Sequence, residues 1–147
     1  MTQEEYKVRI LIRNRIREYG AALEASEEME QILSGRMVEK GKTTYVFYEE
    51  TNEDGGITAS RLAIRHDEVS LKRTGAVSWD MRFAPGVISN GIYRTPQGDF
   101  SMDVETKNLM LERENDTVRV GLSYELEIQK AHRQCCELWM RIEKRDR

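Results

Sequence analysis

Apolar and polar residues alternate one by one along most of the chain. The clearest run is TVRVGLSYELEIQ at 117–129, where every second residue from Val118 to Ile128 is apolar. A period of two is typical of an antiparallel β-strand with one buried face. YKVRILIRNRIRE at 6–18 repeats the pattern, and further alternating runs cover 43–51, 57–66, 87–95, 99–111 and 137–144. With two less regular segments considered below, the pattern predicts about nine strands.

Short turn sequences separate these runs. Glycine, proline and asparagine occur at 40–42, 54–56, 85–86, 95–98 and 115–116, where they favour tight turns between strands. Consecutive hairpins form a meander, and closing the sheet removes both of its exposed edges. The sequence therefore predicts an all-β fold, in which residues 1–147 form one domain and a single antiparallel meander closes into a β-barrel of about 8–10 strands.

The segment AALEASEEMEQIL at 21–33 does not settle on one structure. Its composition favours a helix, with acidic residues at the start. Gly35 and the apolar Met37 and Val38 lead directly into the turn at 40–42, which favours a strand from Met29 to Lys40 with a bulge near Gly35. Helix, loop and strand all stay open for residues 21–33.

The segment LKRTGAVSWDMRF at 71–83 is interpreted as part of one bent strand. From Val69 to Phe83 the odd positions keep the same parity across Arg73 and Gly75, and Gly75 provides a bend of the kind that barrels need. Arg73 then shares an inner face with Trp79. A buried arginine needs an anionic or carbonyl partner, because an unpaired buried charge is very costly.

Composition limits the partners. The 147 residues include 26 acidic and 23 basic side chains, and the net charge of −3 gives no general attraction to nucleic acid or to anionic lipid. No apolar stretch is long enough to cross a membrane as a helix, and the amino terminus does not resemble a leader. We expect a cytoplasmic protein with no nucleic-acid or membrane partner. Cys135 and Cys136 are adjacent and cannot link separate elements, so reduced thiols, a redox switch and a soft-metal site remain alternatives.

Catalytic and metal-binding patterns are weak. His66 and His132 are the two histidines, and neither has metal-ligand spacing to a carboxylate or a cysteine. Glu50 to Gly55 resembles the start of a calcium loop, but Arg61 stands where the bidentate glutamate belongs, so a turn is favoured. A nucleophilic cysteine beside His132 is conceivable without being indicated. We expect no enzymatic activity, no metal and no cofactor.

Four arginines of the first strand, Arg9, Arg13, Arg15 and Arg17, form a ladder on its outer face. Such a ladder could follow a phosphate backbone, but it lacks interleaved aromatic residues for stacking bases. In a closed barrel the first strand lies beside a late one, so pairing is favoured with glutamates of the late strands, Glu125, Glu127, Glu137 and Glu143.

The stretches RTGAVSWDMRFAPG, GIYRTPQGDFSMDVETKNL and YELEI resemble the YwiB-like family of bacterial domains of unknown function. The resemblance runs from VRILIRNRI to about Ile142 and implies a calycin-like antiparallel barrel, similar in architecture to lipocalins and fatty-acid-binding proteins. It implies no established activity. The positions that match the family pattern are Arg73, Gly75, Phe83, Gly86, Tyr93, Thr95, Pro96, Gly98 and Thr106.

The barrel interior is where a function is most plausible, because a barrel of this size either fills itself with side chains or holds one small ligand. Alternation places large residues on the inner face: Trp79, Met81, Phe83, Phe100, Met102, Met110, Tyr124 and Met140. Asn14, Thr106 and Arg73 are the polar residues of that face.

Two hypotheses follow. In the first, the barrel binds a small amphipathic or hydrophobic ligand, with Arg73 pairing with a carboxylate or phosphate head and Trp79, Phe83, Phe100, Met102 and Tyr124 lining the tail. In the alternative, the barrel is solid, Arg73 pairs internally with a glutamate or a strand carbonyl, and the protein is a structural or interaction module. Its partner contacts would lie on the outer face or the open ends, and it could form a homodimer through an exposed edge strand. Substituting the outer residues Arg13 and Arg15 should then abolish association. An enzyme would need inward carboxylates near Arg73, and the alternation does not by itself place one there.

Overall fold

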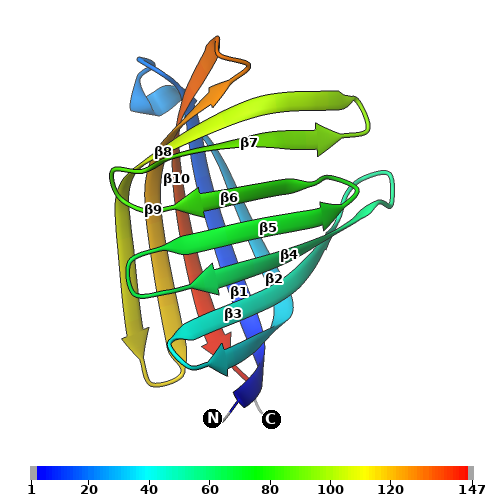
Figure 1. Cartoon of the computed structure of the whole chain (residues 1–147), viewed down its shortest axis with the longest axis vertical. Coiled ribbons are helices and arrows are strands. Elements are labelled where there is room, and N and C mark those ends of the chain that lie inside the picture. The colour runs from blue at the N-terminus through cyan, green and yellow to red at the C-terminus, as the bar shows by residue number, and fades with distance from the viewer. Residues whose placement is uncertain (1–2, 146–147) are drawn as a thin grey trace.

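The computed structural model describes residues 3–145, which form ten strands and one short 3-10 helix (Figure 1). The strands are β1 (Gln3–Glu18), β2 (Glu27–Lys40), β3 (Thr43–Thr51), β4 (Ile57–Ile64), β5 (Val69–Gly75), β6 (Trp79–Phe83), β7 (Ile88–Thr95), β8 (Gly98–Glu114), β9 (Thr117–Ile128) and β10 (His132–Lys144). The helix η1 (Leu23–Ala25) lies between β1 and β2. No helix of the described residues is long and apolar enough to cross a membrane.

The strands form one antiparallel sheet in the order β6-β5-β4-β3-β2-β1-β10-β9-β8-β7. Each strand pairs with its neighbours in the sequence except β6 and β7, which are the two end strands of the sheet, and β1 also pairs with β10, with Val8 opposite Lys144. The two end strands approach one another at Ser78 and Arg94, which exchange backbone hydrogen bonds of 2.9 Å. The sheet is therefore nearly closed into a barrel (Figure 1), and the predicted all-β meander is confirmed.

The prediction of one bent strand at 69–83 is wrong, because this segment is the hairpin of β5 and β6. Val69 lies opposite Phe83, and Arg73 lies opposite Trp79. Directly opposed residues of an antiparallel pair face the same side of the sheet. An odd-length turn between the two strands keeps the parity of the sequence pattern, so alternation alone could not separate one strand from two. The inner face was assigned correctly: Met81 and Phe83 are 1% and 2% exposed.

Residues 27–40 form a strand, which settles most of the segment left open by the sequence. The bulge predicted near Gly35 is absent. The pairing of β2 with both neighbouring strands continues without a shift through Gly35, which lies opposite Val8 on β1 and Tyr48 on β3. Gly35 instead marks a close approach of strands. A Cβ at this position would lie 2.5 Å from the carbonyl oxygen of Phe47 and 2.8 Å from Cδ1 of Ile10.

A β-bulge does occur in β8, between Thr106 and Asn108. Even-numbered residues face inward before the bulge, and odd-numbered residues do so after it. Met110 therefore lies on the outer surface, where it is 46% exposed, and its predicted inward position is wrong.

The packed core fills the half of the barrel where β1 begins and β10 ends. Val8, Ile10, Met37, Val46 and Ile142 are each at most 1% exposed there. Full burial of such a side chain stabilises the fold by roughly 1.5–3 kcal/mol. The opposite half of the barrel is less completely filled.

Candidate functional site

An inner cavity of about 350 Å³ occupies this second half of the barrel. Its wall is largely apolar, and it includes residues from the second half of β1 and the first half of β10, such as Ile16 and Leu138. Met29 belongs to the wall and is 58% exposed, which places the cavity opening near the start of β2. A barrel of this size that is partly unfilled has room for one small molecule.

Six of the eight predicted site residues line this cavity: Asn14, Arg73, Trp79, Phe83, Met102 and Tyr124. Two do not. Phe100 is 36% exposed near the beginning of β8, opposite Tyr93, and Thr106 is 1% exposed outside the cavity wall. The structure therefore brings together residues from β1, β5, β6, β8 and β9 that are far apart in the sequence.

Arg73 pairs internally with a carboxylate, as the alternative hypothesis predicts, although the sequence reasoning did not identify which residue supplies it. Its Nη2 lies 3.4 Å from Oε1 of Glu50, and the two side chains are 22% and 25% exposed. Glu50 lies at the end of β3, on the same inward parity as the buried Thr44 and Tyr48. That parity was available in the sequence, but Glu50 had been assigned to the turn. β4 separates β3 from β5, so the pair depends on side chains reaching across a strand.

Two nitrogen donors beside this pair have no hydrogen-bond partner among the described residues. They are Nε of Arg73 and Nε1 of Trp79, which are both buried. Arg73 and Trp79 face one another across the β5–β6 hairpin and both line the cavity. A buried donor without an acceptor costs about 1–3 kcal/mol.

Aromatic rings form much of the remaining wall. The ring of Trp79 lies 5.7 Å from that of Tyr93, and the ring of Phe83 lies 5.0 Å from that of Tyr124, measured between centroids. Both pairs are tilted, which is a favourable arrangement for aromatic rings. They give one side of the cavity a rigid apolar surface.

Cys136 belongs to the same wall, opposite Tyr124. Burial raises the pKa of the Cys136 thiol to about 12, so the thiol stays protonated at neutral pH. Burial also raises the pKa of the Tyr124 hydroxyl above its usual range. A nucleophilic cysteine needs a lowered pKa, and this environment does the opposite. Both cysteines are free, and Cys135, the next residue along the strand, points to the other face.

The structure offers little for a metal. No group of three or more histidine, cysteine or carboxylate side chains lies close enough to hold an ion within residues 3–145. His132 pairs with Glu18, with 2.8 Å between Nε2 and Oε2. The calcium-like segment is a hairpin turn, in which the backbone N–H of Asn52 donates a hydrogen bond of 2.9 Å to the backbone carbonyl of Gly56.

The arginine ladder lies on the outer face, as expected, and β1 does lie beside a late strand. Its carboxylate partners are mainly on β2 and not on the late strands. Arg13 pairs with Glu30 at 3.3 Å, and Arg15 pairs with Glu28 at 2.9 Å. Among the late-strand glutamates predicted as partners, Glu137 contacts the ladder, with 3.4 Å between its Oε1 and Nη1 of Arg15.

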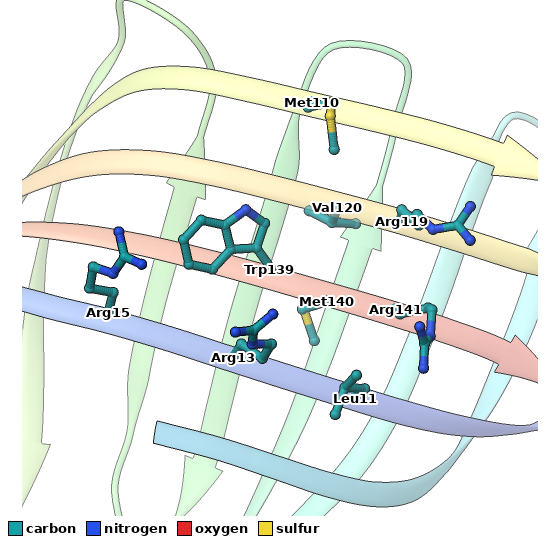
Figure 2. Close-up of a pocket in the computed structure, with 9 residues that line it drawn as sticks. All are labelled: Leu11, Arg13, Arg15, Met110, Arg119, Val120, Trp139, Met140 and Arg141. Carbon is teal, nitrogen blue, oxygen red and sulfur yellow. The ribbon is translucent and has the colours of Figure 1, made fainter. Parts of the chain in front are cut away.

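A second hollow, of about 320 Å³, lies on this outer face beside the ladder. Figure 2 shows Trp139 on β10 with Arg13 and Arg15 on β1 and Arg119 on β9 around it. Trp139 is 37% exposed, and the guanidinium of Arg15 lies 5.6 Å from its ring centroid. The sequence reasoning missed this outward aromatic residue because it considered β1 without its partner strand, where Trp139 lies opposite Arg13.

Comparisons with known proteins agree with this architecture. A family model described as "Domain of unknown function (DUF1934)" matches residues 10–140. The uncharacterized β-barrel protein YwiB of Bacillus subtilis (strain 168) is 24% identical over 91 residues, which are 62% of this chain and 63% of YwiB. The sequence match thus spans less than two thirds of that relative.

Among solved structures, the crystal structure of the ywiB protein from Bacillus subtilis superposes with a TM-score of 0.83 at 19% identity. The superposition covers 97% of this chain and 94% of that one. At this level of identity the likeness shows a shared β-barrel fold.

Proposed function

The chain belongs to the DUF1934 family, and from that premise and the cavity of its barrel we propose that it binds a small amphipathic or hydrophobic molecule inside the barrel. The observation that carries the proposal is the cavity of about 350 Å³, whose largely apolar wall contains one polar cluster at Arg73 and Glu50. Apolar walls with a few placed polar groups are characteristic of small-molecule sites. The proposal assigns binding to the cavity and no catalytic step.

The size of the cavity limits the ligand. Small-molecule pockets measure about 300–1,000 Å³, so this one is near the lower end. An eight-carbon chain with a small polar head is a suitable probe. The wall also includes Met29, Met102 and Met140, whose flexible thioethers can repack around ligands of different shape. We place this activity in the cytoplasm, since adjacent cysteines give the fold no stabilising cross-link for an oxidising compartment.

The tryptophans provide an assay. The chain has two of them, Trp79 in the cavity wall and Trp139 on the outer face. A Trp139→Phe variant therefore reports on the cavity through Trp79 alone. Octanamide and octanoate are titrated separately into this variant, and we expect at least one of them to change the emission saturably with one site per chain.

A matched pair of substitutions on β2 provides the control. Gln31 lines the cavity, whereas its neighbour Ile32 is 56% exposed on the outside. Gln31→Phe should fill the cavity and weaken binding at least tenfold, while Ile32→Phe should leave binding unchanged. If neither probe gives a saturable signal, or if both substitutions have the same effect, the cavity is not a ligand site.

A second candidate function is self-association through the outer face around Trp139. The exposed Trp139 and Met110 give this face an apolar centre, and paired charges of both signs surround it, such as Arg13 with Glu30 and Arg119 with Glu114. A patch that carries both signs around an apolar centre can be complementary to a second copy of itself across a two-fold axis.

Sedimentation velocity tests this candidate. The wild-type chain should dimerise in the micromolar range, and Trp139→Ala should shift the equilibrium to monomer, with Ile88→Ala as the control because Ile88 is 60% exposed elsewhere, on β7. A wild-type chain that stays monomeric at about 100 μM would exclude self-association of this strength.

A further inference from the structure

Two residues of the cavity wall, Arg73 and Trp79, carry buried hydrogen-bond donors that need an acceptor. Arg73 Nε and Trp79 Nε1 are buried and have no partner among residues 3–145, and their side chains face each other across the β5–β6 hairpin. Both groups donate and neither can accept. An occupant that places an acceptor oxygen between them removes the cost of two unpaired donors.

The charge beside these donors is already balanced. Arg73 contributes one positive charge, and Glu50, 3.4 Å away, contributes one negative charge. The other titratable residues of the wall are tyrosines and Cys136. Burial, followed by the charge of Glu50, raises the pKa of Tyr48, and burial raises the pKa of Tyr124 and Cys136, so these groups are neutral at pH 7. The described wall thus has no net charge.

Because the charge of Arg73 is already neutralised by Glu50, the cavity is poorly suited to an anionic ligand. A carboxylate that enters beside Arg73 loses its hydration and also meets Glu50, which repels it and competes for the same guanidinium. A neutral carbonyl can accept the same two hydrogen bonds without either cost. Asn14 and Gln31 also line the cavity and could accept hydrogen bonds from the N–H groups of an amide.

We propose that the ligand is an uncharged amphiphile, and that its head is a carbonyl group of the amide or ester class that accepts hydrogen bonds from Arg73 Nε and Trp79 Nε1. This inference rests on the proposed binding function and specifies its ligand. It also differs from the first of the two sequence-based hypotheses, in which Arg73 would pair with a carboxylate or phosphate head. Glu50 is the residue that makes the difference.

Octanamide and octanoate test the inference, because they share a tail and differ in the charge of a head of similar shape. In the Trp139→Phe variant at pH 7, we expect octanamide to bind at least tenfold more tightly than octanoate. Tighter or equal binding of octanoate would overturn the uncharged-ligand inference while leaving the proposed binding function intact. Absence of binding by both would overturn the inference and the proposed function together.

A charge-removing substitution tests the role of Glu50 directly. Glu50→Gln keeps the shape of the side chain and leaves Arg73 without its balancing charge, so the affinity for octanoate should rise at least tenfold relative to octanamide. Glu49→Gln is the matched control, because Glu49 is the adjacent residue on β3 and is exposed on the outer side. A preference that does not change in Glu50→Gln, or that changes equally in Glu49→Gln, would contradict the role of Glu50.

Discussion

Gly75 determines how the hairpin that carries Arg73 and Trp79 turns, and substituting it gives a stringent test of the structure. Its φ is +119°, a conformation that residues with a side chain rarely adopt. A Cβ at Gly75 would also overlap the carbonyl oxygen of Ile57 on β4. That same oxygen accepts a hydrogen bond of 2.9 Å from the amide of Ala76. Gly75→Ala therefore introduces both backbone strain and a clash with a neighbouring strand.

Gly55 separates these two effects. It also has a positive φ, of +88°, but a Cβ there would meet no atom within 4 Å. Gly55→Ala should cost only the backbone strain, about 1 kcal/mol. Gly75→Ala should cost a further 2–3 kcal/mol or so, because relieving the overlap strains the packing and disturbs the Ala76 hydrogen bond.

Equilibrium unfolding in urea measures the difference. With a slope of about 1–3 kcal/mol per molar urea for a small protein, the midpoint of Gly75→Ala should lie roughly 1–2 M below that of Gly55→Ala. Equal midpoints for the two variants would mean that Gly75 does not approach β4 in this way, and the placement of the β5–β6 hairpin would be wrong.

Three further predictions concern the interior. Thr106 is 1% exposed and its hydroxyl has no hydrogen-bond partner in the described part of the chain. Thr106→Val should therefore raise the free energy of unfolding, measured in urea, by about 1 kcal/mol. A lower free energy of unfolding would show that the hydroxyl does have a hydrogen-bond partner. Burial raises the pKa of the Cys136 thiol from 9.0 to about 12, so above pH 9 the unfolded chain loses a proton that the folded chain keeps. Stability should fall there by about 1.4 kcal/mol per pH unit for this group, and Cys136→Ala should make the fall of urea-derived stability between pH 9.5 and 11 shallower by this amount, while the buried Tyr124 still contributes to it; an unchanged slope would contradict the burial of Cys136. Finally, Cys135 should react with a disulfide reagent in the native state and Cys136 only after unfolding, so rapid labelling of both thiols in the folded protein would refute the assigned faces.

Within 69–83 the alternation of the sequence was sufficient to assign which residues face inward, because the odd-length turn keeps the parity across the hairpin. For the same reason it could not reveal that 69–83 contains a turn. The turn depends on Gly75 fitting against Ile57, a contact between segments that are separate in the sequence. The inward positions of Arg73 and Trp79 were predictable, and their direct opposition was not.

The errors elsewhere have equally local causes. The bulge between Thr106 and Asn108 adds one residue to β8 and moves Met110 to the outside, with no turn residue to signal it. Glu50 could have been placed on the inner face from the parity of β3, but its pairing with Arg73 across β4 requires the folded sheet. The sequence therefore predicted the cation of the cavity and did not identify the carboxylate that balances it.

The most direct test of the account is a crystal structure of the protein grown with octanamide. The account predicts octanamide inside the barrel, with its tail between the aromatic pairs and its carbonyl oxygen roughly 2.7–3.2 Å from Arg73 Nε and Trp79 Nε1. A cavity that stays free of octanamide at saturating concentration, or octanamide bound only at the outer hollow beside Trp139, would contradict it.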